Sequence, residues 1–302
     1  MKRRLLAGAF ALAVGYAVYS FKAHDLGKPE SALARLPTDN AAVLAVDFSA
    51  LRQAGMLDWL AGPVVDEEPE YKAFVAKTGF DYRRDLDHAF VSFHPSGVYF
   101  LVRGRFRWKQ LEAYAVEQGG GCGGGTCRMP GSTPARKISF FPLSSTLMAM
   151  AVGFDESAAE PMREPAKGTR PIAIPLQPVW LSLPSAVLKK SDSFPDGTRL
   201  FAKAMEDAQS VTISLAAQGK ALEAQMDVVC RDAREAGILT AQFQKLTTVL
   251  GQIIAKEKQT PNPADLSGVL TAGVFEQQDA KVIGRWPIER AFLDNLAGKS
   301  PK

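Results

Sequence analysis

Polar and apolar residues alternate between residues 87 and 106, and this period of two predicts two strands joined by a tight turn. Phe90 and Ser92 fall on one side of the first strand, whereas Val91 falls on the other. The same alternation returns at residues 210–230, where Ala-Ala-Gln-Gly-Lys marks the turn. The sequence therefore predicts two similar β-hairpins.

The segments that flank the two hairpins also correspond to each other, which indicates an internal duplication. The matching pairs are the strands 41–48 and 178–184, the helices 71–80 and 198–208, and the helices 107–118 and 232–246. Strands that are interrupted by helices and that form hairpins predict an α+β fold. We expect two β-α-β-β-α-β-like units that form a mostly antiparallel sheet with helices packed on one face.

This pattern divides the chain into segments. They are a signal anchor or signal peptide (1–23), a polar linker (24–40), the first repeat (41–155), a second linker rich in Pro and Ala (156–177) and the second repeat (178–298). Residues 259–268 read as a break, followed by a last hairpin at 269–287 that turns near Gln278 and a closing helix at 288–296.

Two of the predicted helices have marked features. Ser49 is the expected N-cap of a helix that runs to Leu60 and ends before Gly62-Pro63. The longest helix, 232–257, carries an apolar stripe with steps of three and four residues. The stripe consists of Leu239, Phe243, Leu246, Leu250 and Ile253. We expect it to cover the sheet, and an oligomer seam is the alternative.

The N-terminus has the features of an export signal. Lys2, Arg3 and Arg4 precede an apolar run without charges, from Leu5 to Phe21. An uncleaved anchor would hold the chain in the inner membrane through residues 5–21 as a single-pass protein. The alternatives are a signal cleaved after Val18-Tyr19-Ser20, which gives a secreted periplasmic protein, and a buried cytosolic helix. In the first two cases the body lies outside the cytoplasm.

The charge of the body argues against nucleic acid as a partner. The chain has 302 residues, of which 46% are hydrophobic, and its formal net charge is +4. Lys2, Arg3 and Arg4 supply three of these charges, so the remainder carries 4 − 3 = +1. Binding to phosphates requires a concentrated basic face, which a nearly neutral body does not predict.

The two cysteines of a glycine-rich segment are the most specific local feature. Cys122 and Cys127 lie within residues 119–134, which we expect to be a loop because of the density of Gly and Pro. In an oxidising compartment they predict a small structural disulfide. A metal site and a redox-active dithiol are the alternatives. Cys230 is expected to be a buried, unpaired thiol.

The remaining candidate chemistry is weak. A phosphate-binding loop would require a strand before the glycines and Lys-Ser/Thr after them, but a helix precedes and Cys127-Arg128 follow. His88 and His94 share a strand face, near Asp85 and Asp87, but they are too far apart in an extended strand to bind one metal. No common catalytic motif occurs. We therefore expect no enzyme activity, no catalytic or cofactor-binding residues, no cofactor and no metal.

The start of the body resembles a family of uncharacterised bacterial envelope proteins. Leu36, Pro37 and Asp39 are followed by an apolar strand that ends in Asp47. The exported body of those proteins opens with a similar Leu-Pro-x-Asp segment and a strand ending in Asp. The resemblance implies an envelope location and an α/β body, and it implies no activity.

These observations favour an exported, membrane-tethered protein that acts as a non-catalytic binding or scaffolding module of the cell envelope. Its expected partners are the inner membrane and another envelope protein. Two alternatives remain: a carrier of a hydrophobic ligand held between sheet and helices, and a redox or enzyme function centred on Cys122 and Cys127.

Overall fold

The protein folds around one antiparallel sheet. Its structure, a computed structural model, describes residues 28–57, 68–166, 172–190, 196–218 and 221–296. The sheet has 12 strands in the order β11-β12-β10-β9-β8-β1-β2-β3-β7-β6-β5-β4. Every pair of neighbouring strands is antiparallel, so the predicted α+β class is confirmed. The strands are β1 (Ala42–Asp47), β2 (Leu86–His94), β3 (Gly97–Gly104), β4 (Gly121–Gly123), β5 (Thr126–Pro130), β6 (Lys137–Ser144), β7 (Leu147–Gly153), β8 (Val179–Pro184), β9 (Ser210–Gln218), β10 (Ala221–Val229), β11 (Val274–Gln278) and β12 (Lys281–Ile288).

The described helices connect these strands. They are α2 (Pro29–Leu33), α3 (Phe48–Gln53), α6 (Pro69–Thr78), α7 (Tyr82–Asp85), α8 (Trp108–Glu117), the 3₁₀-helix η1 (Glu160–Arg163), α9 (Ser185–Leu188), α10 (Asp196–Ala204), α11 (Ala233–Lys256), α12 (Leu266–Thr271) and α13 (Arg290–Leu296). Within the described ranges, no helix combines the length and the apolar character that a membrane span requires. The apolar run 5–21 lies outside these ranges.

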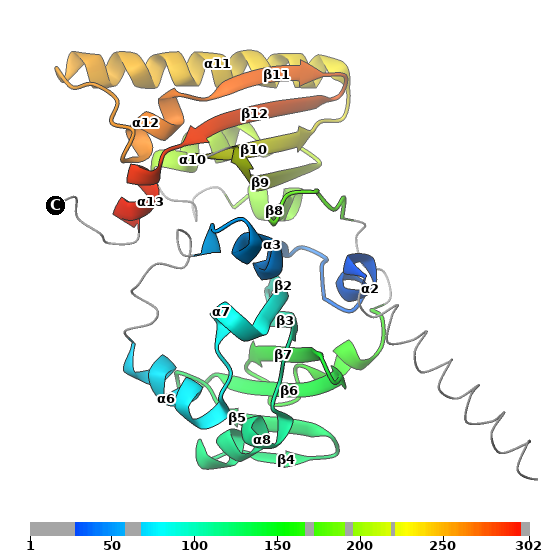
Figure 1. The fold of residues 1–302 in the computed structure, drawn as a ribbon. Helices are drawn as coiled ribbons and strands as arrows, with labels where there is room; N and C mark the ends of the chain where they lie inside the picture. Colours follow the sequence, from blue (N-terminus) through cyan, green and yellow to red (C-terminus); the bar gives the residue numbers. More distant parts are fainter. Residues whose placement is uncertain (1–27, 58–67, 167–171, 191–195, 219–220, 297–302) are drawn as a thin grey trace, which may run out of the picture.

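The two repeats meet at the centre of the sheet, where β1 pairs with β8. Outward from this seam, the first repeat runs β1-β2-β3-β7-β6 and the second runs β8-β9-β10-β12-β11. The two orders are equivalent, with α8 and α11 at the same place in the connection. Because β1 and β8 are antiparallel, an approximate two-fold axis between them relates the two halves (Figure 1). The duplication thus forms one continuous sheet.

Most of the helices cover one face of this sheet, which we call the helical face. Here α3 packs against β2, α10 packs against α11, α11 packs against β11 and β12, and α8 packs against β4 and β5. On β1, Val46 joins this core, whereas its neighbour Ala45 points to the opposite face. The opposite face packs against α2, η1 and the segment 172–174. The sheet is therefore covered on both sides near the seam.

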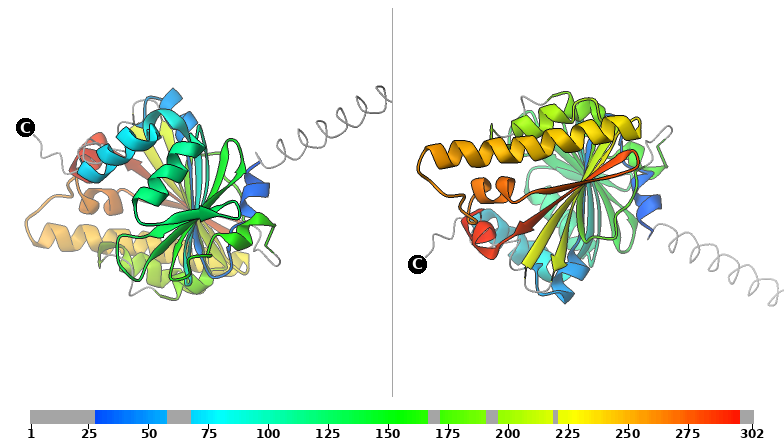
Figure 2. Two further views of the ribbon diagram at one scale, coloured as in Figure 1. Left: turned by 90° about the horizontal axis from the view of Figure 1, so that it is seen from below. Right: turned by 90° about the horizontal axis from the view of Figure 1, so that it is seen from above.

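The apolar stripe of α11 covers the sheet over only part of its length. Phe243 is fully buried and Leu239 is buried, but Ile253 is 49% exposed. Figure 2 shows the reason, because the C-terminal end of α11 extends past the strands. The prediction that this stripe packs on the sheet therefore holds for its first part, and it is wrong for Ile253.

Several other local predictions are corrected by the structure. The N-cap of α3 is Asp47, whose Oδ1 accepts a hydrogen bond from the Ala50 N–H at 2.8 Å, and not Ser49. The helix ends at Gln53, and the expected end at Leu60 lies outside the described residues. Residues 29–33 and 160–163, expected within linkers, form α2 and η1.

Candidate functional site

The glycine-rich segment forms a β-hairpin, which corrects the loop expected over residues 119–134. Strands β4 and β5 pair in register, with Cys122 opposite Cys127. Gly124 and Gly125 connect them with φ values of 61° and 75°. A two-residue turn with positive φ at both positions is a favoured hairpin connection, and glycine adopts it without strain. The pair Gly-Gly was therefore a hairpin signal within a composition typical of loops.

The expected disulfide between Cys122 and Cys127 is present. Cys127 is buried against Leu111 and Ala115 of α8, whereas Cys122 is exposed. The bond therefore ties the edge strand of the sheet to a strand that contacts the core. Cys230 is a buried free thiol, and burial raises the pKa of this thiol.

Replacing both Cys122 and Cys127 by Ser is expected to lower the free energy of unfolding by about 2 kcal/mol or less. A loop this short loses little conformational entropy when it is closed. Urea unfolding followed by circular dichroism measures the change. A loss of the whole fold would contradict the prediction, because only the β4–β5 edge depends on this bond.

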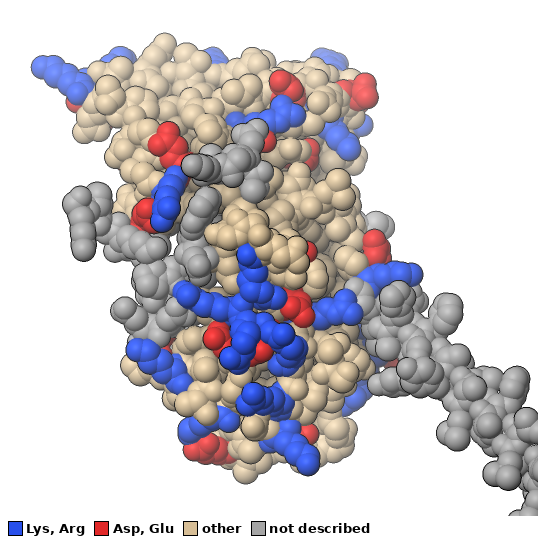
Figure 3. Space-filling view, in the orientation of Figure 1, with Lys and Arg blue, Asp and Glu red and all other residues tan. Residues whose placement is uncertain are grey.

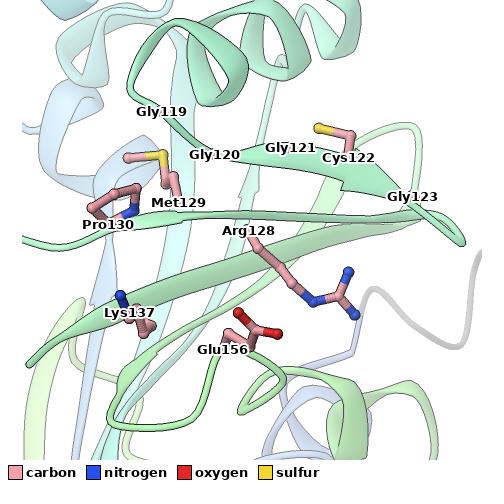
Figure 4. Close-up of a pocket in the computed structure, with 10 residues that line it drawn as sticks. All are labelled: Gly119, Gly120, Gly121, Cys122, Gly123, Arg128, Met129, Pro130, Lys137 and Glu156. Atoms are coloured by element: carbon pink, nitrogen blue, oxygen red, sulfur yellow. The ribbon is translucent and has the colours of Figure 1, made fainter.

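An open groove of about 440 Å³ lies beside the hairpin, and Figure 4 shows the residues that line it. Arg128, Lys137 and Glu156 approach it from one side of the sheet, whereas the sulfur of Cys122 points to the other side. Alternation along the strands explains this arrangement, because Cys122 and Arg128 belong to opposite faces. The disulfide and the charged groups of the groove therefore do not form a common redox site.

The charged groups near this groove serve to fix η1 on the sheet. Glu160 accepts hydrogen bonds from Thr126 Oγ1, from Arg163 Nε at 2.7 Å and from Arg128 Nη2 at 3.3 Å. The hydrogen bond from Thr126 and the guanidinium of Arg163 lower the pKa of Glu160. The ionised carboxylate thus links η1 to β5 through these side-chain contacts, which is a structural task.

The structure separates the histidines and aspartates that the sequence places close together. His94 Nδ1 lies 2.7 Å from Ser96 Oγ, within the β2–β3 turn. His88, at the other end of β2, faces Asp47 with 3.6 Å between Nδ1 and Oδ1. Asp85 and Asp87 bind arginines instead. In the described ranges, no three His, Cys, Asp or Glu side chains come close enough to hold a metal ion.

Figure 3 shows Lys and Arg side chains gathered over α7, within a body that is nearly neutral. These arginines form an ordered network. Arg84 and Arg105 both bind Asp85, and Arg52 binds Asp87 at 2.8 Å. Arg52 also donates to the carbonyl oxygens of Arg83 and Leu86. Much of this charge is therefore used to hold α7 against β2 and β3.

The second repeat carries an apolar groove between α10 and α11, which lie side by side on the helical face (Figure 2). The groove has a volume of about 340 Å³ and is open to solvent. It is lined by Leu200, Lys203, Ala204, Gln242, Lys245, Leu246 and Val249. A neighbouring hollow shares Ala204 and Gln242 with it and adds Ile238. The two hollows form one surface, called the α10–α11 groove below.

The α10–α11 groove exposes large apolar side chains. Leu200 is 53% exposed, Ile238 51% and Val249 38%, and Ile253 continues the same side of α11. Isolated exposed apolar residues are common, but a continuous apolar patch marks an interaction site in many proteins. This surface was not predicted, because the predicted apolar stripe of α11 was expected to be buried against the sheet. Ile238 and Val249 lie outside that stripe, and these two apolar residues were the sequence signal from which the surface could have been predicted.

Comparison with known proteins shows the fold alone. No protein-family model matches the chain, and no curated protein sequence matches it. Among solved structures, crystal form I of TP0453 matches 89% of this chain and 98% of its own, with a TM-score of 0.50 and 11% identity. The two chains share a fold. Crystal form III of TP0453 matches 88% of this chain and 97% of its own, with a TM-score of 0.49 and 8% identity.

Proposed function

We propose that this chain is a non-catalytic binding module of the cell envelope, tethered to the inner membrane through residues 5–21, that docks a partner protein on the α10–α11 groove. Removal of the tether by signal cleavage would give a periplasmic form with the same groove. The location rests on the basic residues and the apolar run at the N-terminus.

The observation that carries the proposal is the exposed apolar surface of the α10–α11 groove. Full burial of one large aliphatic side chain contributes about 1.5–3 kcal/mol. In the isolated chain part of this free energy is not gained, because Leu200, Ile238 and Val249 are only partly buried. A partner that covers them therefore gains affinity from residues that add little to the stability of the fold.

The shape and charge of the groove favour an amphipathic helix with acidic residues beside its apolar face. A shallow groove between two helices accepts a third helix, whose apolar residues recur at steps of three and four. Lys203 and Lys245 line the half of the groove that carries Leu200 and Val249, and they would meet the acidic residues there. The half that carries Ile238 has charges of both signs, from Asp207, Arg231 and Glu235.

The open shape also distinguishes this function from that of a hydrophobic-ligand carrier. Small-molecule sites bury about 70–90% of the surface of a drug-sized ligand. The α10–α11 groove is open along its length, so an acyl chain within it would remain largely in water. A protein helix supplies its own outer surface and does not need such enclosure.

Site-specific photo-crosslinking in native membranes tests the proposal. A benzophenone side chain at Ile238 or Val249 of the full-length chain is expected to give one discrete protein adduct. The same probe at Phe154, which is 66% exposed on the first repeat, is expected to give none. The double change Lys203→Glu and Lys245→Glu should reduce the adduct at least tenfold, whereas Lys281→Glu on β12 should not. Equal adducts at Phe154, insensitivity to the charge reversal, or lipid adducts only would overturn it.

A further inference from the structure

A small cavity lies at the seam between the two repeats, away from the α10–α11 groove. Its volume is about 170 Å³. Strands β1 and β2 of the first repeat line one side, and β8 with the preceding segment 174–178 lines the other. Pockets form preferentially at the junctions of structural units, and this one lies beside the approximate two-fold axis. We call it the seam cavity.

The inner part of the seam cavity is aromatic and apolar. Trp180 is buried, and its ring lies 6.5 Å from that of Phe90. Ile174, Pro175 and Pro178 complete this part of the lining. An apolar cavity of about 150 Å³ can hold a benzene molecule. The seam cavity therefore has room for one six-membered ring and a few further atoms.

The outer part of the seam cavity carries a carboxylate. Asp47 Oδ1 accepts the hydrogen bond of the Ala50 N–H, and His88 Nδ1 lies 3.6 Å away. Both side chains are 35% exposed, so solvent and ligands can reach them. Among the residues that the structure describes, the cavity lining contains no Lys or Arg. Arg103 lies opposite His88 on β3 but is not part of this lining.

We propose that the seam cavity binds a small organic cation, namely a primary amine that carries one apolar ring. The ring would lie against Trp180 and Phe90, and the ammonium group would meet the carboxylate of Asp47. Aromatic faces and a carboxylate both attract a cation, and neither favours an anion. This site is independent of the α10–α11 groove, because the described linings of the two have no residue in common.

Titration of the full-length chain with three matched probes tests this proposal. The probes are 2-phenylethylamine, 2-phenylethanol and 3-phenylpropionate, which share a ring and differ in charge. Calorimetry or saturation-transfer NMR is expected to show that the amine binds at least tenfold more tightly than the alcohol, and that the carboxylate binds most weakly. Equal affinity of the three probes, or no binding of the amine at millimolar concentration, would refute the site.

The variant Asp47→Asn separates the charge of this residue from its structural task. Asn caps a helix about as well as Asp, so the N-terminus of α3 keeps its hydrogen bond. The affinity for 2-phenylethylamine is expected to fall to that for 2-phenylethanol, and the affinity for the alcohol should not change. Asp232→Asn is the matched control, because Asp232 caps α11 in the same way at 2.8 Å from the Glu235 N–H. If both variants bind the amine as the wild type does, Asp47 is not its partner.

Discussion

Replacing Phe243 by Ala is expected to lower the free energy of unfolding by about 3–5 kcal/mol, the usual cost of removing a fully buried phenyl ring. Phe243 has no exposed surface, and its ring lies 5.7 Å from that of Phe201 and 4.9 Å from that of Phe275. The change would leave a cavity between α10, α11 and β11, and all three elements would have to move to fill it. Urea unfolding followed by circular dichroism measures the loss.

Phe154→Ala is the control for this change. Phe154 is 66% exposed, and its ring contacts only the guanidinium of Arg136 among the described aromatic and cationic neighbours, at 4.6 Å. Its removal is expected to change the free energy of unfolding by about 0.5 kcal/mol or less. Similar losses for the two variants would show that burial of Phe243 is not what holds α11 in place. The milder variant Phe243→Leu keeps part of this packing. It is therefore expected to keep the α10–α11 groove intact, so that it can be used in the crosslinking test.

Local periodicity explains why much of the fold could be predicted. The two hairpins show a period of two, and α11 shows steps of three and four residues, because each has one side against the core. These patterns depend on neighbours in sequence and can be read without a structure. The repeated order of elements then gives the duplicated α+β architecture.

The pairing of β1 with β8 could not be predicted in this way. Ala45 opposes Trp180 in the sheet, although they come from different repeats. An apolar strand such as β1 has the same pattern whether its neighbour is β2 alone or β2 and β8 together. The seam cavity depends on this long-range pairing, so its lining residues had no common signal in the sequence.

Other errors came from choosing between competing local signals. Asp47 and Ser49 are both good N-cap residues, and the structure places the helix start after Asp47. The glycine-rich segment was assigned by composition, although Gly124-Gly125 between two short segments also predicts a hairpin. In both cases the decisive signal was present, and the choice depended on where the chain had to turn.

Replacing Asp85 by Asn is expected to destabilise the fold by about 1.5 kcal/mol at pH 7, because a nearly buried carboxylate loses its charge-assisted hydrogen bonds. The guanidinium groups of Arg84 and Arg105 are 61% and 64% exposed, so they stay solvated and the cost of stranding a buried charge does not arise. The Asp85 side chain is only 10% exposed, and it binds Arg84 Nη2 at 2.8 Å and Arg105 Nε at 3.2 Å. Burial by itself would raise the pKa of Asp85. The hydrogen bond from Arg84, the N–H of Asp81 and the charges of both arginines outweigh burial and hold this pKa below its usual value.

The sign of the pH dependence follows from that lowered pKa. Asp85 contributes its full stabilisation above the pKa of an unfolded Asp, about 3.9, and the contribution is lost as the pH falls through the lower pKa of the folded state. The wild type and Asp85→Asn should therefore differ most at neutral pH and converge on acidification below about pH 4. Asp87→Asn is the control, because Asp87 is 39% exposed and binds Arg52 alone among the described side chains. This variant is expected to lower the free energy of unfolding by about 1 kcal/mol or less. A difference between wild type and Asp85→Asn that stays constant down to pH 2 would show that Asp85 acts through packing and not through its charge.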